Sequence, residues 1–274
     1  MKHCILMTVY KDVEQINRII EFAPENFDFY VHIDKKSKLT RSDISKRANV
    51  FSEYRIYWGA VEHLKAFLFL MNKAFHSGKQ YDFYHLITGQ DFYATSFDNF
   101  EKLLDKDKIY ITVYKEDKEA YDKWVSMGVD PTHLIKLESN FWEIGEGPCG
   151  PDSEIFYDRG IKYDKDNLGI KLLTDEIDNS RYVEVWNNVF SQFNAKEGLN
   201  RNEYPELPSK NIDTGMGLER MTCVINEVES AYDTDLFSEI ISGIEELKNK
   251  KYNSSREFRI IADHIRALTF TICD

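Results

Sequence analysis

The densest run of chemically versatile residues is DTGMGLER, which begins at Asp213 and ends at Arg220. Gly215 and Gly217 lack side chains, so the backbone there can approach a flat or anionic ligand closely. Arg220 can offer a fixed fork of donors to a phosphate, or stack on a base. Asp213 can pair with a ligand ammonium. The set suits a ligand with both an amine and a phosphate, such as an amino acid activated by ATP, although a glycine-containing turn before a helix explains the same residues.

A second set of polar residues follows three apolar runs in the first half of the chain. These residues are Val9-Tyr10-Lys11, Asp34-Lys35-Lys36 and Gly89-Gln90-Asp91. Open parallel sheets bind ligands at the carboxyl ends of their strands. An acid for ribose hydroxyls or a uracil edge, with lysines for a diphosphate, would suit a nucleotide sugar. Ordinary polar loop residues are the alternative interpretation.

The elements that must position this second set alternate between strand and helix patterns. Short apolar runs indicate strands, and apolar residues at helical spacing indicate helices. The expected order is strand, helix, strand, strand, helix, strand, over Cys4 to Tyr10, Val13 to Phe22, FDFYVHID, Tyr54 to Tyr57, Val61 to Phe75 and YDFYHLIT. This order predicts an α/β layer with a largely parallel sheet.

The second half has a different character. YITVYKED reads as a strand that runs into a helix at EAYDKWVSM, and a Gly/Pro-rich stretch, IGEGPCGPDSEIFYDRG, follows. The alternation in YVEVWNNVFSQFN predicts an antiparallel strand. KNIDTGMGLERM leads into a helix, and the sequence from Ala231 onward is mostly helical in pattern. We therefore predict two domains, residues 1–108 and 109–274, with the boundary near Lys106 to Tyr110.

Composition narrows the class of protein. The chain has 274 residues, of which 42% are hydrophobic and 30% charged, with a formal net charge of -12. This balance gives no sign of a polybasic nucleic-acid or membrane surface, although a local basic face could still bind tRNA. The N-terminus reads as a strand and no apolar run approaches the roughly 20 residues of a membrane span. A cytoplasmic protein is the resulting expectation.

The cysteines are scattered, at Cys4, Cys149, Cys223 and Cys273. No CxxC pair or Cys/His ligand spacing occurs. A disulfide framework and a structural zinc site are therefore not expected in this segment.

Five long motifs in the second half carry a family resemblance. In order they are NFWEIGEGPCGPDSEIFYDRG, RYVEVWNNVFSQFN, KNIDTGMGLERM, YDTDLF and IIADHIRALTF. From about Ile111 to Asp274 the chain resembles the alanyl-tRNA synthetase family, which is a class II family. The resemblance implies part of an antiparallel sheet with C-terminal helices, and alanine, ATP with Mg, and tRNA(Ala) as ligands and partners. The fold class expected for the whole chain is thus α/β followed by α+β.

The resemblance also implies residue roles. GMGLER looks like motif 3 of the class, so Arg220 would contact ATP, with Gly215 and Gly217 close to the nucleotide. Asp213 would pair with the alanine ammonium. Trp142 and Asn187 match positions that line the alanine pocket, where an indole wall suits a methyl side chain. Trp142 could instead be plain core, and Asn187 could cap a strand end.

Two features depart from the family pattern. Where many relatives read GPCGPC, this chain has GPCGPD, with Asp152 at the second cysteine. Motifs 1 and 2 of the class belong upstream of TVYKED, and that region holds no motif 2 arginine loop. Since positioned donors supply much of the catalytic effect, we expect the chain alone not to aminoacylate tRNA. The cluster Asp263, His264 and Arg266 is expected to be solvated or tRNA-facing, and no catalytic residue is assigned.

The first half carries a different resemblance, through HCILMTVYKDVEQINRII, FDFYVHIDKKS, YWGAVEHLKAFLFLMNKA and YDFYHLITGQDF. From about Met1 to Lys106 it is similar to the core-2/I-branching and xylosyltransferase-like glycosyltransferases. The resemblance implies a GT-A-like half-domain that takes a UDP-sugar without a metal. The residues expected by the donor nucleotide or in the strand-end acidic motif are Val9, Tyr10, Lys11, Asp34, Lys35, Lys36, Trp58 and Asp91.

Three hypotheses about function follow. The chain derives from an alanine–tRNA ligase with a foreign N-terminus, or from a glycosyltransferase whose C-terminal half, with its general base, has been replaced. Alternatively it is a non-catalytic fusion product. The longer and more specific motifs favour the first hypothesis.

Overall fold

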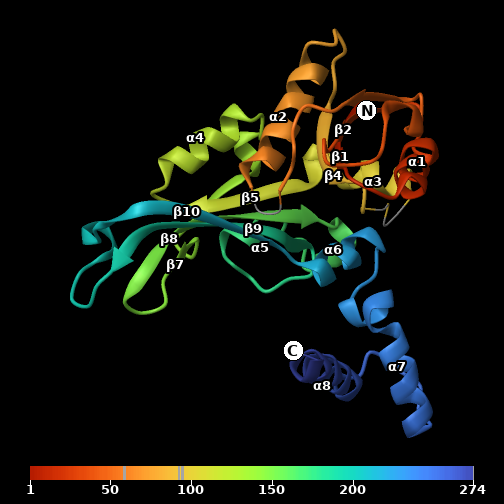
Figure 1. Ribbon diagram of the computed structural model, residues 1–274. Helices are drawn as coiled ribbons and strands as arrows, with labels where there is room; N and C mark the ends of the chain where they lie inside the picture. Colours follow the sequence, from red (N-terminus) through yellow and green to blue (C-terminus); the bar gives the residue numbers. More distant parts are fainter. Residues whose placement is uncertain (58–59, 92, 94–95, 274) are drawn as a thin grey trace. The chain divides into compact units, whose positions relative to one another are not determined.

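The chain folds as two compact units, residues 1–102 and 103–274 (Figure 1). The computed structural model describes residues 1–57, 60–91, 93 and 96–273. The break between the units falls after residue 102, whereas the sequence places the domain boundary after residue 108. We call residues 1–102 unit 1 and residues 103–274 unit 2, and describe each by itself.

Unit 1 is a parallel sheet with helices on both faces. Its main elements are β1 (His3–Val9), α1 (Val13–Phe22), β2 (Phe27–Ile33), β3 (Ala48–Phe51), α2 (Val61–Phe75), β4 (Phe83–Thr88) and α3 (Phe97–Leu103). The strand order is β3-β2-β1-β4, and every neighbouring pair is parallel. This agrees with the α/β class expected from the sequence, while the finer GT-A likeness stays a prediction.

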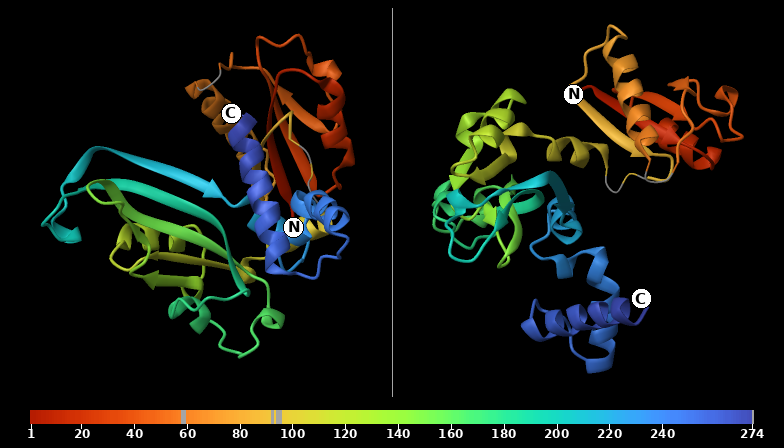
Figure 2. Two further views of the ribbon diagram at one scale, coloured as in Figure 1. Left: turned by 90° about the horizontal axis from the view of Figure 1, so that it is seen from below. Right: turned by 60° about the vertical axis from the view of Figure 1, so that its left-hand side comes forward.

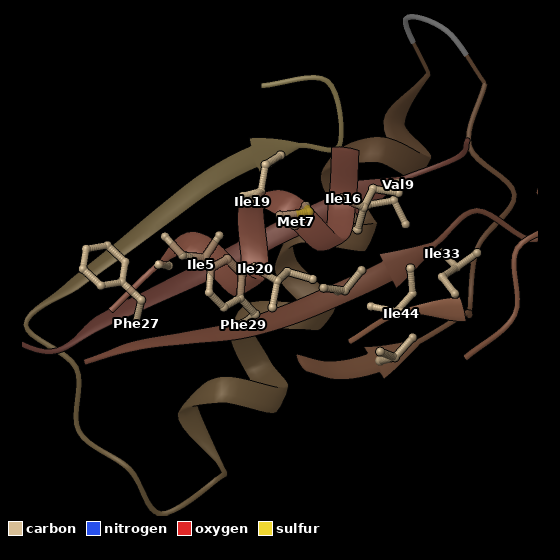
Figure 3. Packing of buried hydrophobic residues seen from close by; sticks show 13 residues of the cluster. Ile5, Met7, Val9, Ile16, Ile19, Ile20, Phe27, Phe29, Ile33 and Ile44 are labelled. Carbon is tan, nitrogen blue, oxygen red and sulfur yellow. The ribbon is translucent and has the colours of Figure 1, made fainter. Parts of the chain in front are cut away.

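The core of unit 1 follows from the alternation of side chains along buried strands. On β1, Ile5, Met7 and Val9 point to one face and pack with Ile16 and Ile20 of α1 (Figure 3). Cys4 and Leu6 point to the other face, where they pack with Leu70 and Ala74 of α2. Both faces of the sheet are therefore covered, as parallel sheets require.

The strand expected at Tyr54 to Tyr57 is wrong. The strand lies earlier, at β3, and residues 54–57 are irregular. Their backbone N–H groups are used by side chains instead of a neighbouring strand: Tyr54 N–H donates to His32 Nε2 at 3.0 Å, and Ile56 N–H donates to Asp34 Oδ1 at 3.2 Å. Such bonds compete with a strand ladder for the same donors.

Unit 2 is built on a mixed sheet. Its elements are β5 (Ile109–Tyr114), α4 (Lys118–Ser126), β6 (Leu134–Leu137), β7 (Phe141–Trp142), β8 (Gly147–Asp158), α5 (Lys171–Thr174), β9 (Tyr182–Ala195), β10 (Glu206–Met216), α6 (Leu218–Ile225), α7 (Asp235–Lys248) and α8 (Arg256–Cys273). The strand order is β10-β9-β8-β5-β6, with β7 beside β8. The long antiparallel strands β8, β9 and β10 run together across it (Figure 2), but β5 and β6 pair in parallel, which the antiparallel expectation missed.

The Gly/Pro-rich stretch forms most of β8, because one glycine permits a close approach of two strands. A Cβ on Gly150 would lie 2.1 Å from the carbonyl oxygen of Phe190 on β9. The register between β8 and β9 shifts between Cys149 and Asp152, next to this contact. Beyond this shift Asp152 pairs with Val189 and Glu154 pairs with Asn187, and the register shifts again between Ile155 and Phe156.

Helices cover the sheet of unit 2 from two sides. Trp124 of α4 donates from Nε1 to Ser153 Oγ at 3.2 Å and packs near Ile111 and Ile155. On the opposite face, Leu172 and Leu173 of α5 pack with Phe156 and Ile135. The C-terminal helices α7 and α8 pack as a pair through Phe237, Ile241, Ile244, Phe258 and Ala262 (Figure 2).

Candidate functional site

One face of the sheet in unit 2 gathers polar side chains from three strands. Two rows of directly paired residues cross the strands: Asp213, Val189 and Asp152 in one, and Gly215, Asn187 and Glu154 in the other. Directly paired residues, and residues two apart on a strand, project from the same face. We call Asp152, Glu154, Asn187, Asp213 and Gly215 the polar face.

The polar face is buried at Asp152, which is 7% exposed. Asp152 Oδ1 accepts a hydrogen bond from Asn140 Nδ2 at 2.8 Å, and its Oδ2 accepts one from Asn187 Nδ2 at 3.5 Å. Burial raises the pKa of Asp152, and the charge of Glu184 adds to the rise while both amides oppose it. No Lys, Arg or His side chain pairs with this carboxylate among the described residues.

A second carboxylate, Glu154, lies beside Asp152 on the same strand. Burial, together with the charges of Asp152 and Glu184, raises the pKa of Glu154 to about 7. Its Oε2 accepts from Thr112 Oγ1 at 3.3 Å. Two carboxylates with raised pKa values on one sheet face are typical of functional sites rather than of plain structural contacts.

Glu154 also borders a cavity of about 500 Å³ on this side of the sheet. Glu184 and Arg220 contribute to its wall, as do Leu172 and Leu173 of α5. Arg220 Nη1 forms an ion pair with a Glu184 carboxylate oxygen and lies 3.4 Å from the Glu184 carbonyl oxygen. The arginine side chain is 54% exposed, so its remaining donors can still reach a ligand.

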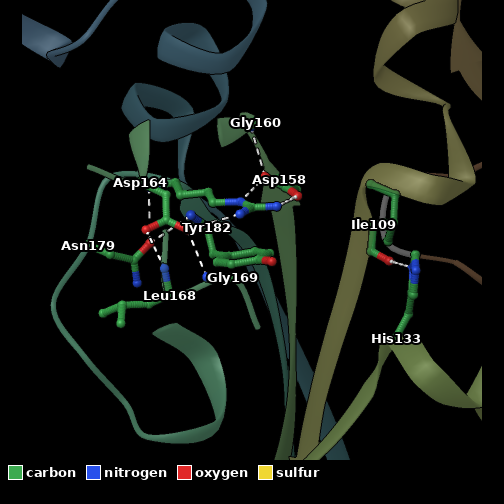
Figure 4. Close-up of polar contacts among 10 residues, drawn as sticks. Ile109, His133, Asp158, Gly160, Asp164, Leu168, Gly169, Asn179 and Tyr182 are labelled. Carbon is green, nitrogen blue, oxygen red and sulfur yellow. Dashed lines mark hydrogen bonds and ion pairs between the residues drawn. The ribbon is translucent and has the colours of Figure 1, made fainter. Parts of the chain in front are cut away.

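An ion cluster joins the two ends of the segment that carries α5 (Figure 4). Arg181 binds Asp158 with two bonds of 2.8 Å, from Nε and Nη2, and Asp164 with one of 3.0 Å from Nη1. Asp164 also accepts from the N–H groups of Leu168 and Gly169. Since these residues flank α5, the cluster pins residues 158–181 next to the cavity.

The three residues expected to bind alanine have different surroundings. Asn187 and Asp213 share the polar face, with Asn187 against Asp152 and Asp213 exposed on the edge strand β10. Trp142 lies on β7, and its Nε1 donates to the Phe190 carbonyl oxygen of β9 at 3.0 Å. The indole is thus fixed to the strand that carries Asn187. Their role in binding alanine stays a prediction.

The residues expected to bind ATP lie at the end of β10 and the start of α6. Gly215 pairs with Asn187, and a Cβ placed on it would meet nothing within 4 Å, so the space above it is open. Gly217 is the residue before α6, and a Cβ there would touch the Arg220 side chain at 3.4 Å. The strand–turn–helix therefore brings Gly215 and Arg220 to one side of the sheet, next to the cavity.

The residues present fit a magnesium-bound nucleotide better than a bare one. The cavity is lined by Glu154, Glu176, Asp178 and Glu184 but by a single cation, Arg220, among the described residues. A bare triphosphate would be repelled by these carboxylates, whereas Mg²⁺ prefers carboxylate and phosphate oxygens. The described residues contain no group of three or more His, Cys, Asp or Glu side chains that could hold a metal ion without a ligand's help.

In unit 1 the strand ends bring three of the expected residues together. Asp34 is buried and accepts from Lys36 N–H at 2.9 Å. Lys36 Nζ lies 3.6 Å from Asp34 Oδ2, 4.3 Å from the centre of the Tyr57 ring and 5.8 Å from that of Tyr10. We call Tyr10, Asp34, Lys36 and Tyr57 the lysine cage.

The other residues expected near a nucleotide sugar are less closely assembled. Val9 is buried in the core, whereas Lys11 and Lys35 are exposed at the strand ends. Asp91 is exposed after β4, where its carboxylate accepts from Thr88 N–H. Trp58 lies outside the described residues. A nucleotide-sugar site therefore stays a prediction.

Sequence reasoning missed Asn140, Glu154 and Glu184 as members of the site. Asp152 and Glu154 are two residues apart in a strand, which places both on one face, and this spacing was the available signal. The signal is weak without the knowledge that SEIFYD is a strand, because the preceding GPCGP favours a turn. Glu184 could not be found, since its partner Arg220 is distant in sequence.

The charged cluster on α8 has structural partners. Arg266 forms an ion pair with Glu219 of α6, and its guanidinium lies 5.0 Å from the centre of the Phe237 ring. Asp263 and Arg266 line a further cavity of about 700 Å³. These contacts give no reason to assign catalysis there. Across the described parts of the chain, no helix combines the length and the apolar character needed to span a bilayer.

Comparison with known proteins identifies the family. The model of the family "tRNA synthetases class II (A)" matches residues 62–274, which begins upstream of the start near Ile111 expected from the motifs. Alanine–tRNA ligase of Lactococcus lactis subsp. cremoris (strain MG1363) is 58% identical over 171 residues, covering 61% of this chain and 20% of the relative. Alanine–tRNA ligase of Streptococcus thermophilus (strain ATCC BAA-491 / LMD-9) is 54% identical over 174 residues, covering 62% of this chain and 20% of the relative.

The same family was expected from the motifs between Asn140 and Phe270. The chain spans about a fifth of the length of the curated relatives it matches. The family match covers most of the chain, including all of unit 2 with its polar face and the strand–turn–helix at Gly215. The chain therefore belongs to the class II (A) family of tRNA synthetases.

Proposed function

We propose that unit 2 supplies the alanine- and ATP-binding face of an alanine–tRNA ligase. The observation that carries the proposal is that Asn187, Asp213 and Gly215 share one sheet face with Glu154, and that Glu154 and Arg220 line a cavity there. The relatives described above are alanine–tRNA ligases, which supports alanine as the amino acid that is bound. The reaction class is activation of alanine by ATP, followed by transfer to tRNA(Ala).

Each group has a role in this proposal. Asp213 and Asn187 hold the amino acid, and the indole of Trp142 walls the pocket for its methyl group. Arg220 takes a phosphate of ATP, and the open space above Gly215 admits the nucleotide to the backbone. Glu154 and Glu184 supply oxygen ligands to Mg²⁺, which when bound neutralises phosphate charge.

The local charge argues that this face alone does not complete the reaction. Acyl and phosphoryl transfer require several positive or N–H donors aimed at the developing charge. Around the cavity the described residues provide one guanidinium, Arg220, and Glu184 already occupies part of it. We expect alanine-dependent ATP–pyrophosphate exchange by this chain to stay at background, and binding of the ligands to be the measurable activity.

Titration of the 274-residue chain with Mg-ATP tests the proposal. Arg220→Ala should weaken Mg-ATP binding about tenfold, because a charge-assisted phosphate contact is lost. Arg256→Ala is the matched control, since Arg256 is an exposed arginine at the start of α8. Equal affinities of the unsubstituted chain and both variants, or no binding by any of them, would refute a nucleotide site at Arg220.

Glu184→Gln sharpens the same test. This change frees Arg220 and removes one carboxylate from the cavity, so ATP should bind more tightly in the absence of Mg²⁺. With Mg²⁺ present the gain should vanish or reverse, because an oxygen ligand to the metal is lost. A gain of the same size under both conditions would argue against a metal held by Glu184.

The lysine cage carries a second candidate function, which is binding of a UDP-sugar by unit 1. A lysine held between two aromatic rings at the carboxyl ends of parallel strands suits a uridine diphosphate. Calorimetric titration with UDP, comparing the unsubstituted chain with Lys36→Ala, tests it. Submillimolar affinity that depends on Lys36 supports the candidate, and affinity unaffected by the change removes it.

A further inference from the structure

The carboxylate of Asp152 has an unusual set of partners. It is buried in the sheet and receives one hydrogen bond each from the amides of Asn140 and Asn187. Asn140 is 1% exposed, and its side chain also bonds Glu154. Both partners are neutral, so this buried carboxyl group has no cation beside it among the described residues.

This arrangement fixes the orientation of both amides. Both oxygens of Asp152 accept hydrogen bonds, so each asparagine turns its NH₂ group toward this side chain. The amide oxygens then point elsewhere, and a flip would set two acceptors against each other. The Oδ1 atoms of Asn140 and Asn187 are both buried and have no hydrogen-bond partner within the described chain.

Buried acceptors without a donor are rare in folded proteins and call for an explanation. Asn187 is only half-buried as a residue, and it lies on the polar face in register with Gly215 and next to the row that ends in Asp213. An unpaired acceptor oxygen at this position, beside carboxyl groups that have no cation partner, complements a ligand that brings several N–H donors and a positive charge. A primary ammonium has both properties.

We propose that Asp152 and Asn140 are positioning residues, which turn the amide oxygen of Asn187 toward the substrate so that the site selects an amino acid by its ammonium group. The inference rests on the proposed function and adds to it the basis of selection. Asp213 contacts the ammonium from β10, whereas Asp152 acts through Asn187 and does not touch the substrate. Asn140 holds Asp152 and Glu154 in place from the bend just before β7.

The selectivity follows from hydrogen-bond polarity. A site that presents acceptors to an ammonium leaves one of them unpaired when the analogue carries fewer donors. L-Lactate has a hydroxyl where L-alanine has its ammonium, and propionate has a hydrogen. L-Alanine should therefore bind at least about tenfold more tightly than L-lactate, and propionate should bind most weakly.

The experiment compares L-alanine, L-lactate and propionate by NMR titration of the full chain. Asp152→Asn allows the amide of Asn187 to adopt either orientation, so the preference for L-alanine over L-lactate should fall about tenfold. A structural change alone would weaken both ligands equally and leave this ratio unmoved. Asp166→Asn, at an exposed aspartate, is the matched control and should leave the ratio unchanged.

The side-chain ¹⁵N resonance of Asn187 gives an independent readout. It should shift when L-alanine binds and stay in place with propionate. Where Asp152→Asn does not fold, Asn187→Leu removes the presented oxygen directly and should abolish the preference for L-alanine. An unchanged preference in these variants, or no preference in the unsubstituted chain, overturns the inference.

Two further outcomes separate this inference from its basis and from a metal site. Mg-ATP binding that depends on Arg220, together with an alanine preference that ignores Asp152, would keep the proposed function and reject the inference. If the unsubstituted chain binds neither Mg-ATP nor L-alanine, both the proposed function and the inference are rejected. Binding of Mn²⁺ alone that disappears in Asp152→Asn would show that the acceptors serve a metal, and it would also overturn the inference.

Discussion

Asp34 in unit 1 and Asp152 in unit 2 are both buried aspartates, but their surroundings differ. Asp34 accepts from the N–H groups of Lys36 and Ile56, and the Lys36 ammonium lies 3.6 Å away. Asp152 receives two neutral amides whose own oxygens are unpaired. The first carboxylate has a cation of its own chain beside it, whereas the second has two amides whose oxygens lack partners.

The difference shows how to tell a structural carboxylate from a functional one. A buried charge that is matched by backbone donors and a cation stabilises the fold that surrounds it. A buried charge that orients unpaired acceptors costs stability, and it persists where a ligand supplies the missing donors. By this criterion Asp34 stabilises the segment that contains Ile56, and Asp152 contributes to ligand binding at the polar face.

The largest effect is expected at a third carboxylate, Asp158, whose pairing is more complete than that of Asp34. Arg181→Ala would leave Asp158 buried without its cation, because the guanidinium supplies two bonds of 2.8 Å. The unfolding free energy of unit 2 should fall by about 3–5 kcal/mol. Guanidinium chloride denaturation followed by tryptophan fluorescence measures the change.

An exposed ion pair provides the control for this prediction. Lys118 pairs with Asp122 on the surface of α4, so Lys118→Ala should change the unfolding free energy by less than about 0.5 kcal/mol. Similar losses in Arg181→Ala and Lys118→Ala would mean that burial of the Arg181 cluster contributes nothing, and the pinning of residues 158–181 would have to be abandoned.

A smaller effect, with opposite consequences at the two sites, tests the comparison itself. Asp34→Ala leaves two backbone N–H groups without an acceptor and should destabilise unit 1 by about 1–3 kcal/mol. Asp152→Asn removes a carboxyl group that has no cation beside it and keeps the shape of the side chain, so unit 2 should stay within about 1 kcal/mol of its original stability or gain. Urea unfolding measures the loss of stability in both variants. A larger loss in Asp152→Asn than in Asp34→Ala would contradict the distinction drawn between the two aspartates.

The last expected effect is a dependence of the unfolding free energy on pH through Glu154. Its pKa rises to about 7 in the folded chain from an ordinary value of 4.5, so the folded state holds the proton more tightly. Folding is therefore favoured at low pH, and this contribution is lost as the pH rises from about 4.5 to about 7. Glu154→Gln should flatten the decline in unfolding free energy across that interval.

Denaturation at several pH values between 4.5 and 8 measures this slope. Glu229→Gln, at an exposed glutamate, should leave the slope of the unsubstituted chain intact. If the slope for Glu154→Gln equals the slopes for the unsubstituted chain and for Glu229→Gln, then Glu154 ionises as freely as a surface carboxylate. The polar face would then be better solvated than its contacts indicate.

Much of the fold was predictable from local patterns. The alternation in YVEVWNNVFSQFN identified β9, and the glycines before Leu218 marked the turn from β10 into α6. The strand expected at Tyr54 to Tyr57 was wrong because His32 and Asp34, which are distant in sequence, take its backbone donors. Local propensity does not register such long-range side-chain bonds.

The site was less accessible to sequence reasoning than the fold. Motifs indicated Asn187, Asp213, Gly215 and Arg220 as residues of interest, but their common face depends on strand register. That register is set by shifts in β8 next to Cys149 and Ile155, which no local pattern specifies. The pairing of Asp152 with Asn140 and Asn187 follows from the same register.

The most direct test of the account is an NMR map of L-alanine binding to the full chain in the presence of Mg-ATP. We predict shifts at residues 150–154, 186–189 and 213–220 and at the Asn187 side chain, with residues 34–36 unmoved. This result would assign alanine to the polar face and leave the satisfied carboxylate of unit 1 out of it. Shifts confined to unit 1, or none on β8, β9 and β10, would contradict the central claim.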